Sequence, residues 1–582
     1  MRPTDRRNLV IAALAICLLM PFAVQARPGD SDGADGGRPS ATYMGVQHAV
    51  RFDVSPPLRD IARLLPLPLQ FEAEIADEGD TGLEGPYGPQ DADAAVQGAV
   101  GEGTLPPPDV SFDGPISVGF TPPDSVGDVG PNHYVAMSNV TSTIHNKTGT
   151  IVMGPFNNNS LWSGFGGDCE TNNSGDPVVL YDQLADRWLL SQFTSSGPTF
   201  FNCVALSTTG DPTGTYFRWA FPTDTPTNFP DYPKYGVWPE AYLLATREFS
   251  AAGPFAGVGA YALNRVEMLA GNPSPQVIAF LATPAGVGIA NIGDGLLPSD
   301  LDGTNPPPGG SPGVFVGSMD NGGPYGASQD ALTIWEFDFD FSNPPASSFT
   351  LVDTLPVAAF DSIFPCSPGS RDCIPQPGTT VKVDHQGYRQ RVIHRLAYRN
   401  FGDHQSMVTN QSVEVPTAIS GVRWYELRNT GGGWSVHQQG TYAPGTGDGI
   451  DRWFGSIAMD ASGNMGLGFS ASDDTATFPS VWYTGRLAGD PLGTLPQGED
   501  SIIDGGGSQL SSGHRWGDYS SMNIDPVDDC TFWFVSEYYP VTASSSWRMR
   551  IGSFRFPSCM SDFLFGDGFE TGDTSAWDQT AN

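Results

Sequence analysis

The segment "GDPVVLYDQLADRWLLSQF", residues 175–193, decides the fold because it has the pattern of a β-hairpin. An apolar run is followed by a short turn containing Asp and Ala, and then by a second alternating run that carries aromatic residues. The same pattern recurs at residues 123–139, 230–249, 451–470 and 515–539, with two divergent copies at 312–339 and 379–415. Two stacked β-sandwiches would not explain this recurrence. Seven hairpin units predict an all-β fold, a seven-bladed β-propeller.

The composition agrees with short strands joined by many turns. The chain has 582 residues, of which 71 are Gly and 51 are Pro, while charged residues make up only 16%. Lys and Arg number 28 against 64 Asp and Glu, which gives a net charge of −36. Such a chain repels nucleic acid and anionic lipid, so we expect no nucleic-acid partner and expect cations, Ca²⁺ in particular, as the natural small partners.

The first 26 residues have the features of an export signal. Basic residues precede an apolar run, and small residues at 24 and 26 have the spacing of a cleavage site. Arg6 and Arg7 leave open whether the route is the general or the twin-arginine pathway. No later segment is apolar enough to cross a bilayer. The sequence therefore predicts a secreted or outer-surface protein, with the periplasm as the alternative, and a monomer without a transmembrane segment.

The cysteines support this compartment. Seven are present, and removing Cys17 with the signal leaves an even number, which favours disulfides over metal thiolates. Proximity predicts three pairs: Cys169 with Cys203, Cys366 with Cys373, and Cys530 with Cys559. In a propeller, the members of the first pair fall on one face and those of the third pair on the other.

Four parts are expected along the chain. Residues 1–26 form the signal, residues 27–113, rich in Asp, Gly, Pro and Ala, a flexible leader, residues 114–560 the propeller, and residues 561–582 a C-terminal tail. The last blade has only three strands of its own before Cys559. We therefore predict that "ISVGF", residues 116–120, supplies its fourth strand and closes the ring.

Four segments resemble a group of exported bacterial proteins. They are "PPDSVGDVGPNHYV", "GDPVVLYD", "YRNFGDH" and "RWGDYSS", in this order, and the resemblance covers about residues 113–559. The group looks like a β-propeller family without an agreed activity, so the resemblance implies fold and export only. The tail "FLFGDGFETGDTSAW", residues 563–577, is similar to a DGFE-x-G ending found on exported gammaproteobacterial proteins with unrelated main domains. It implies a sorting or attachment tag, and a last strand packed on the propeller is the alternative.

Several carboxylates are predicted to surround one end of the central channel. Aligning the hairpins places Asp124, Asp176, Asp231 and Asp518 at the start of the innermost strands, with Asp451 nearby. Converging carboxylates need cations, and Lys234, Arg452 and Arg515 lie beside them in the sequence. Asp518 has three possible roles: a cap for backbone N–H groups of the next blade, a Ca²⁺ ligand together with Asp176 and Asp231, or part of a ligand-binding site.

The segment "AYRNFGDHQS" is the best catalytic candidate. Tyr398, Arg399 and His404 are residue types that polysaccharide lyases use to move a proton and to neutralise a uronate. We expect "FGDH" to connect the second and third strands of the fifth blade, on the same face as the carboxylates. Strand alternation, however, places Tyr398 and Arg399 on opposite sides, so the three side chains need not converge.

These observations predict an exported interaction protein that binds a glycan or a protein on the channel face of the propeller. A glycan-active enzyme, a lyase or a hydrolase acting at the same face, is the alternative, and a structural envelope protein is a third possibility. Convergence separates the first two, since an enzyme needs a base, an acid and a charge stabiliser in one pocket.

Overall fold

The computed structural model describes residues 37–62, 92–223, 225, 227–250, 253–362, 372–385, 390–415 and 418–559. The chain forms two units, residues 1–38 and 39–582, and the second contains every strand and helix given below. The expected signal and C-terminal tail lie outside the described residues.

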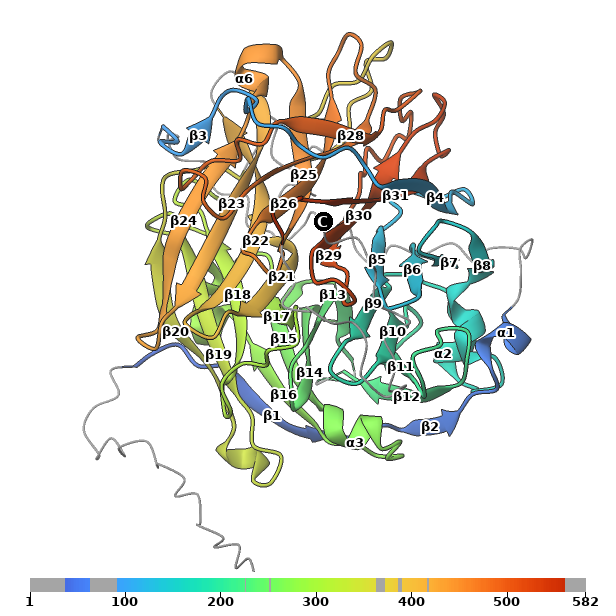
Figure 1. Ribbon diagram of the computed structural model, residues 1–582. Coiled ribbons are helices and arrows are strands. Elements are labelled where there is room, and N and C mark those ends of the chain that lie inside the picture. The colour runs from blue at the N-terminus through green and yellow to red at the C-terminus, as the bar shows by residue number, and fades with distance from the viewer. Residues whose placement is uncertain are drawn as a thin grey trace, which may run out of the picture. The chain divides into compact units, whose positions relative to one another are not determined.

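Seven innermost strands form a closed ring (Figure 1). Each contacts the next in chain order, and the seventh contacts the first. They are β5 (Val126–Val129), β9 (Val178–Asp182), β13 (Phe229–Val237), β17 (Leu297–Leu301), β21 (Ile393–Asn400), β25 (Asp451–Met459) and β29 (Ser521–Ile524). Each is the first strand of one blade, so the predicted seven-bladed β-propeller is confirmed.

The first three blades follow the order of the chain from the channel outward. Blade 1 continues with β6 (His133–Met137), β7 (Thr141–Asn146) and β8 (Ile151–Asn157). Blade 2 continues with β10 (Arg187–Phe193), β11 (Phe201–Ser207) and β12 (Tyr216–Pro222). Blade 3 continues with β14 (Ala241–Phe249), β15 (Phe255–Asn264) and β16 (Val277–Ala282).

The other four blades repeat this order. Blade 4 continues with β18 (Gly313–Met319), β19 (Ala331–Asp338) and β20 (Ser348–Pro356), and blade 5 with β22 (Gln405–Val415), β23 (Ile419–Asn429) and β24 (Trp434–Tyr442). Blade 6 continues with β26 (Met465–Ser472), β27 (Ser480–Arg486) and β28 (Glu499–Ile503), and blade 7 with β30 (Thr531–Tyr538) and β31 (Arg548–Arg555). Parallel pairing of β17 with β21 joins blades 4 and 5 into one sheet.

Helices are short and lie in the connections. They are α1 (Leu58–Ile61), η1 (Asn158–Trp162), α2 (Asp168–Thr171), α3 (Arg265–Leu269), α4 (Pro284–Val287), α5 (Ile289–Ile292), η2 (Pro344–Ala346) and α6 (Gly445–Asp448).

The blades are held together by large side chains that pack sheet against sheet. Phe532, Phe534 and Phe554 of blade 7 form one buried cluster with residues of blade 6. Gly468 of β26 lies directly against this cluster, and a Cβ atom there would come within 2.4 Å of the Phe534 ring. Only glycine allows the ring to sit so close to the neighbouring strand. The aromatic residues of the repeated hairpins therefore form the interface between blades.

Residues 39–62 and 92–116, which we call the strap, form ordered structure along the outer edges of the blades (Figure 1). Strand β1 (Thr42–Gln47) adds to β16 of blade 3, β2 (Arg51–Val54) to β12 of blade 2, and β3 (Val96–Gln97) to β24 of blade 5. Ser40 bridges to Thr350 of blade 4. Gly103 donates its N–H to the carbonyl of Pro496 in blade 6.

The prediction of a flexible leader over residues 27–113 is therefore wrong for the strap. Each strap strand adds to the unpaired backbone of an existing edge, so it needs little apolar density of its own. The apolar anchors are few: Leu58 of α1 is fully buried, and the Tyr43 ring lies 5.4 Å from the Phe280 ring. In the sequence, a polar segment with so few apolar residues resembles a linker.

The closing strand of blade 7 comes from the strap, slightly earlier than predicted. Strand β4 (Val110–Ile116) pairs with β31, whereas the prediction placed the closing strand at residues 116–120. Gly114 and Pro115 interrupt the alternation of β4, which hides the strand in the sequence. The source of the strand, N-terminal to blade 1, agrees with the prediction.

Two of the predicted disulfides are formed. Cys169 pairs with Cys203, and Cys530 pairs with Cys559. Cys366 lies outside the described residues, so its predicted bond to Cys373 stays a prediction. Disulfides are typical of proteins in oxidising compartments, which agrees with the predicted export.

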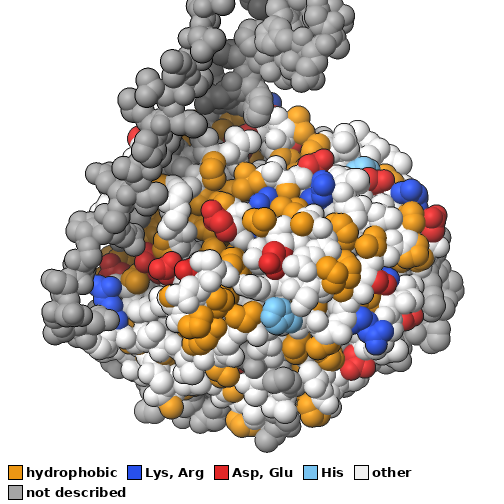
Figure 2. Space-filling model, turned by 90° about the horizontal axis from the view of Figure 1, so that it is seen from below, with side chains coloured by type: hydrophobic (Ala, Val, Ile, Leu, Met, Phe, Trp, Pro, Cys, Tyr) orange, Lys and Arg blue, Asp and Glu red, His pale blue; other side chains and the backbone are white. Residues whose placement is uncertain are grey.

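The face that carries β1, α3 and β2 has a mixed surface. Figure 2 shows charged side chains scattered among uncharged ones, with hydrophobic side chains in small groups between them. Within the described ranges, the structure contains no helix that could span a bilayer.

Candidate functional site

The channel has two ends, and the predicted carboxylates lie at the one where the innermost strands begin, here called the entry end. Asp124, Asp176, Tyr232, Phe454 and Asp518 have positive φ angles between 42° and 58°. The three aspartates lie two or three residues before an innermost strand, and Tyr232 and Phe454 lie at irregularities inside β13 and β25. Asp adopts this left-handed conformation more readily than most residues, which explains its recurrence in the hairpin repeat.

Asp176 caps the neighbouring blade. Its carboxylate accepts a hydrogen bond from the Tyr232 backbone N–H of blade 3 at 3.1 Å and another from the Tyr519 hydroxyl of blade 7 at 2.8 Å. Asn139 of blade 1 accepts from the Asp176 N–H at 2.9 Å and donates to Asp124 at 2.9 Å. The entry end is thus braced across blades 1, 2, 3 and 7.

Lys234 and Asp518 complete this bracing. The Lys234 Nζ atom lies 3.3 Å from the ring centroids of both Tyr232 and Tyr519, and it donates to the carbonyl of Pro233 at 3.1 Å. Burial lowers the pKa of Lys234 well below its usual value, and the nearby Asp176 opposes that shift. Asp518 forms an ion pair with Arg515, and its carbonyl accepts from the Tyr232 hydroxyl at 2.9 Å.

A small cavity lies at the entry end, between blades 3, 4 and 5, and Asp231 pairs with Arg247, one of its lining residues. Arg247 pairs with Asp231 at 3.2 Å and with Asp294 at 2.9 Å, and Arg391 also pairs with Asp294. The Arg391 guanidinium lies 4.1 Å from the Tyr232 ring centroid. This entry cavity is lined by Tyr232, Lys234, Thr246, Arg247, Asp294 and Arg391, among others.

Asp451 and Arg452 contact other partners, contrary to the prediction that they join the carboxylates. Asp451 accepts from the Ser420 N–H at 2.7 Å, and Arg452 pairs with Glu499 at 2.5 Å and Asp448 at 2.9 Å. In the sixth hairpin the left-handed residue is Phe454, and Asp451 lies three residues before it at the start of β25, whereas Asp124, Asp176 and Asp518 themselves occupy the left-handed position. Its Asp therefore occupies a different position.

Asp451 gives the stability a pH dependence. Burial raises its pKa to about 7, although the Ser420 N–H, Arg452 and Lys382 favour the charged form, and Asp473 opposes it. The folded protein therefore binds a proton between roughly pH 4 and pH 7 that the unfolded chain releases, so the free energy of unfolding falls as the pH rises through this range. Asp451→Asn is expected to remove roughly 2–4 kcal/mol of that fall, measured by urea unfolding at several pH values.

The exposed Asp474 offers a matched control for this experiment. Asp474→Asn should leave the pH dependence as it is in the wild type. An unchanged slope in Asp451→Asn would show that Asp451 titrates in its ordinary range.

Tyr398, Arg399 and His404 do not converge, and they lie at the other end of the channel. Strands β21 and β22 are the first and second strands of blade 5, so "FGDH" connects these two and not the second and third. His404 is therefore separated from the entry end by the eight-residue strand β21, about 20 Å. The prediction counted one strand too many, because the described residues between 379 and 392 belong to none of the blade strands and β21 is the first strand of the blade.

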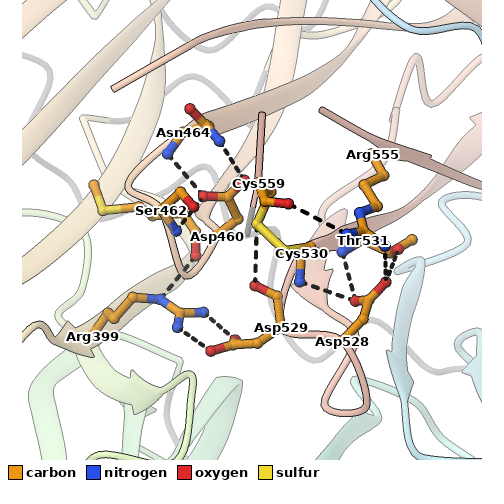
Figure 3. Close-up of a disulfide and its surroundings, with 11 residues drawn as sticks. Arg399, Asp460, Ser462, Asn464, Asp528, Asp529, Cys530, Thr531, Arg555 and Cys559 are labelled. Carbon is orange, nitrogen blue, oxygen red and sulfur yellow. Dashed lines mark hydrogen bonds and ion pairs between the residues drawn. A yellow bond between two sulfur atoms is a disulfide. The ribbon is translucent and has the colours of Figure 1, made fainter. Parts of the chain in front are cut away.

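Each of these three side chains has a structural contact. The Tyr398 ring packs 4.9 Å from Trp238, and its hydroxyl donates to Gln405. His404 stacks on Phe401 at 4.9 Å and bonds the exposed Asp403. Arg399 forms two hydrogen bonds of 2.7 Å with Asp529 and one with the carbonyl of Met459, beside the Cys530–Cys559 disulfide (Figure 3).

A second cavity lies at the exit end, where the innermost strands finish. It is lined by Asp128, Tyr181, Asp300, Asp302, Arg395 and Asn523, among others. Burial raises the pKa of Asp128 to about 8, and Arg395 opposes that shift. None of these residues was among the predicted site residues. "VGDVG" and "PSDLD" place an Asp next to the last residue of innermost strands β5 and β17, which is the signal that could have found them.

Lys234 and Arg515 were predicted at the entry end, but Tyr232, Tyr519, Arg247, Asp294 and Arg391 were not. Tyr232 and Tyr519 each follow an aspartate of the hairpin repeat, in "PDYPK" and "GDYSS", so the repeat itself carried that signal. Arg247, Asp294 and Arg391 had no comparable pattern. Across the described ranges, no three His, Cys, Asp or Glu side chains are grouped so that they could hold a metal ion. The Ca²⁺ site at Asp176, Asp231 and Asp518 stays a prediction.

Comparisons with known proteins give distant structural likenesses only. No family model and no curated protein matches the chain. Among solved structures it is similar to a Hadza microbial sialidase, Hz136, at 9% identity over 74% of each chain with a TM-score of 0.34. It is also similar to the Bacillus subtilis arabinanase Arb43A, at 12% identity over 55% of this chain and 99% of that one with a TM-score of 0.28. Likenesses this distant carry no argument about function, which must come from the site.

Proposed function

We propose that this protein binds an extracellular glycan at the entry cavity, recognising an acidic or hydroxyl group of the sugar. The observation that supports this is the lining of the cavity, where Lys234, Arg247 and Arg391 lie beside the Tyr232 ring. Guanidinium groups bind carboxylates and sugar hydroxyls, and a tyrosine ring offers an apolar face to sugar C–H groups.

The entry cavity is preorganised for such a ligand. Arg247 and Arg391 are both fixed by the buried Asp294, which also accepts from the Tyr325 hydroxyl at 2.8 Å. Residues held this way need no reordering on binding, so less entropy is lost. The lining side chains are nearly fully buried, so the cavity admits one substituent of a glycan and not a whole sugar ring.

The enzyme alternative has less support. Catalysis needs an acid, a base and a charge stabiliser within one pocket, and the candidate residues Tyr398, Arg399 and His404 are dispersed at the opposite end. Binding without turnover is therefore the function that the geometry favours.

Calorimetric titration with uronate-containing and neutral oligosaccharides tests the proposal. The acidic oligosaccharides are expected to bind more tightly, and Arg391→Gln is expected to weaken that binding at least about tenfold, because it removes a charge-assisted hydrogen bond. Arg452→Gln is the matched control, since Arg452 is equally buried but pairs with Glu499 in blade 6. Equal affinities for Arg391→Gln and the wild type would refute the proposal.

A further inference from the structure

The segment before strand β29, residues 514–518, is here called the mouth loop, and it forms part of the entry end. Its residues His514, Gly517 and Asp518 have positive φ angles of 57°, 71° and 58°. Left-handed backbone is unfavourable for residues other than glycine, so His514 and Asp518 keep it only while surrounding contacts hold them. The Asp518 carbonyl accepts from the Tyr232 hydroxyl, and Tyr232 lines the entry cavity. The contacts that hold the mouth loop therefore also hold one wall of that cavity.

Glu537 of strand β30 provides one of these contacts, and it is a buried carboxyl group without a counter-ion. Its side chain is 0% exposed, and its Oε1 atom accepts a hydrogen bond from the Gly517 N–H. Among the described residues, no Lys, Arg or His forms an ion pair with Glu537, and its Oε2 atom has no hydrogen-bond partner. A single neutral N–H donor compensates little of the cost of burying a charge. The geometry therefore favours the protonated, uncharged form of Glu537.

The charged groups that act on Glu537 are carboxylates. Burial raises the pKa of Glu537 well above its usual value, the Gly517 N–H opposes this shift, and Asp384 and Asp518 add to it. Asp384 also supports the mouth loop directly, since its carboxylate accepts from the Trp516 N–H at 3.0 Å. A charge on Glu537 would therefore repel one carboxylate in the mouth loop and another that holds it.

Arginines on the elements around Glu537 are paired with other groups: Arg515 with Asp518, and Arg548 and Arg550 of β31 with Asp113. Blade 1 adds one more carboxylate, that of Asp124, whose backbone N–H donates to the Gly517 carbonyl at 3.1 Å. Tyr539, two residues further along β30, stays neutral, because burial and Glu537 raise the pKa of its hydroxyl well above the usual value. These surroundings stabilise Glu537 only as long as it carries its proton.

We propose that Glu537 is a proton-operated latch, which holds the mouth loop while it is protonated and releases the loop when it ionises. In the protonated state the carboxyl group is neutral and Oε1 holds Gly517. At alkaline pH the proton passes to water, the new charge repels Asp384 and Asp518, and the mouth loop moves so that water can reach the carboxylate. The latch belongs to the unliganded protein and does not depend on the proposed glycan binding.

Hydrogen exchange of the unliganded full-length protein, measured by mass spectrometry between about pH 6 and about pH 9, tests the latch. After correction for the intrinsic pH dependence of exchange, the protection of residues 514–518 is expected to fall at least about tenfold in the wild type. Glu537→Gln keeps an acceptor for the Gly517 N–H but cannot ionise, so its protection should stay constant.

Urea unfolding gives a second readout. Folded Glu537 retains a proton that the unfolded chain releases above roughly pH 4. Its contribution to stability is therefore complete below that pH and is lost as the pH rises to the pKa of the folded state, with the unfolding equilibrium constant increasing by up to about tenfold per pH unit. Glu537→Gln should remove this increase, including the part above about pH 7 that Asp451→Asn leaves in place.

Glu426→Gln is the matched control, because Glu426 is equally buried but pairs with Arg428 in blade 5. Its mouth loop should lose protection with pH as in the wild type. Constant protection in the wild type, or an equal fall in Glu537→Gln, would overturn the proposal. If Glu537→Gln does not fold, infrared spectra of the wild type labelled with ¹³C at its glutamate carboxyl groups decide. An un-ionised glutamate band at neutral pH that disappears together with the protection supports the latch, and its absence refutes it.

Discussion

A variant that lacks residues 39–62 is expected to lose at least about 3 kcal/mol of unfolding free energy and to associate into oligomers. The deletion removes β1 and β2 and so uncovers the backbone of β16 and β12, the outer strands of blades 3 and 2. It also removes the fully buried Leu58 and the Asp53 carboxylate, which pairs at 2.6 Å with the buried Arg218. Urea unfolding and light scattering measure the two effects.

A milder variant distinguishes the effect of losing strand pairing from the effect of changing the exposed apolar residues of the strap. Val50 and Val54 are 65% and 52% exposed, and replacing both by Thr keeps β2 paired while making it more polar. This variant should behave as the wild type. A deletion variant that stays monomeric with unchanged stability would show that the strap strands do not protect the blade edges.

Arg399→Leu is expected to lower the free energy of unfolding by roughly 2–4 kcal/mol and to leave glycan binding at the entry cavity unchanged. The substitution leaves Asp529 without its bidentate partner and frees the carbonyl of Met459, and so it loosens blades 5, 6 and 7 where they meet beside the Cys530–Cys559 disulfide (Figure 3). Urea unfolding gives the first quantity, and titration of the folded variant gives the second.

The companion variant Arg399→Leu, Asp529→Asn should recover part of the lost stability, because the stranded charge is gone. If folded Arg399→Leu instead loses glycan binding while its stability is unchanged, Arg399 is a functional residue, and the catalytic interpretation of "AYRNFGDHQS" returns.

The repeated hairpin made the architecture predictable, because the same pattern of strand, turn and strand recurs in the sequence once for each of the seven blades. The divergent copies show the limit. Residues 312–339 form β18 and β19, the second and third strands of blade 4, and the short first strand β17 was missed. The strap was missed for a different reason, since a strand that joins a finished edge takes its stability from backbone pairing and not from an apolar pattern of its own.

The entry carboxylates were predictable to the extent that they follow the repeat. Asp124, Asp176 and Asp518 share the left-handed position that starts an innermost strand, and all three lie at the entry end. Their partners were not predictable, because contacts such as Tyr519 with Asp176 join residues 343 positions apart. The exit cavity depends on contacts across the channel in the same way, for example that of Arg395 with the carbonyl of Met522.

The pairing of β4 with β31 also determines when the ring can close during synthesis of the chain. Asp113 and Arg550, which bond across this pair at 2.8 Å, are 437 positions apart, so the first partner emerges long before the second exists. Until then, residues 110–116 must remain unpaired on the growing chain. A chain that stopped before residue 548 would contain six complete blades but would lack β31, the strand to which β4 pairs. The last few dozen residues therefore convert an open arc of blades into a ring whose N-terminal and C-terminal strands hold each other in place.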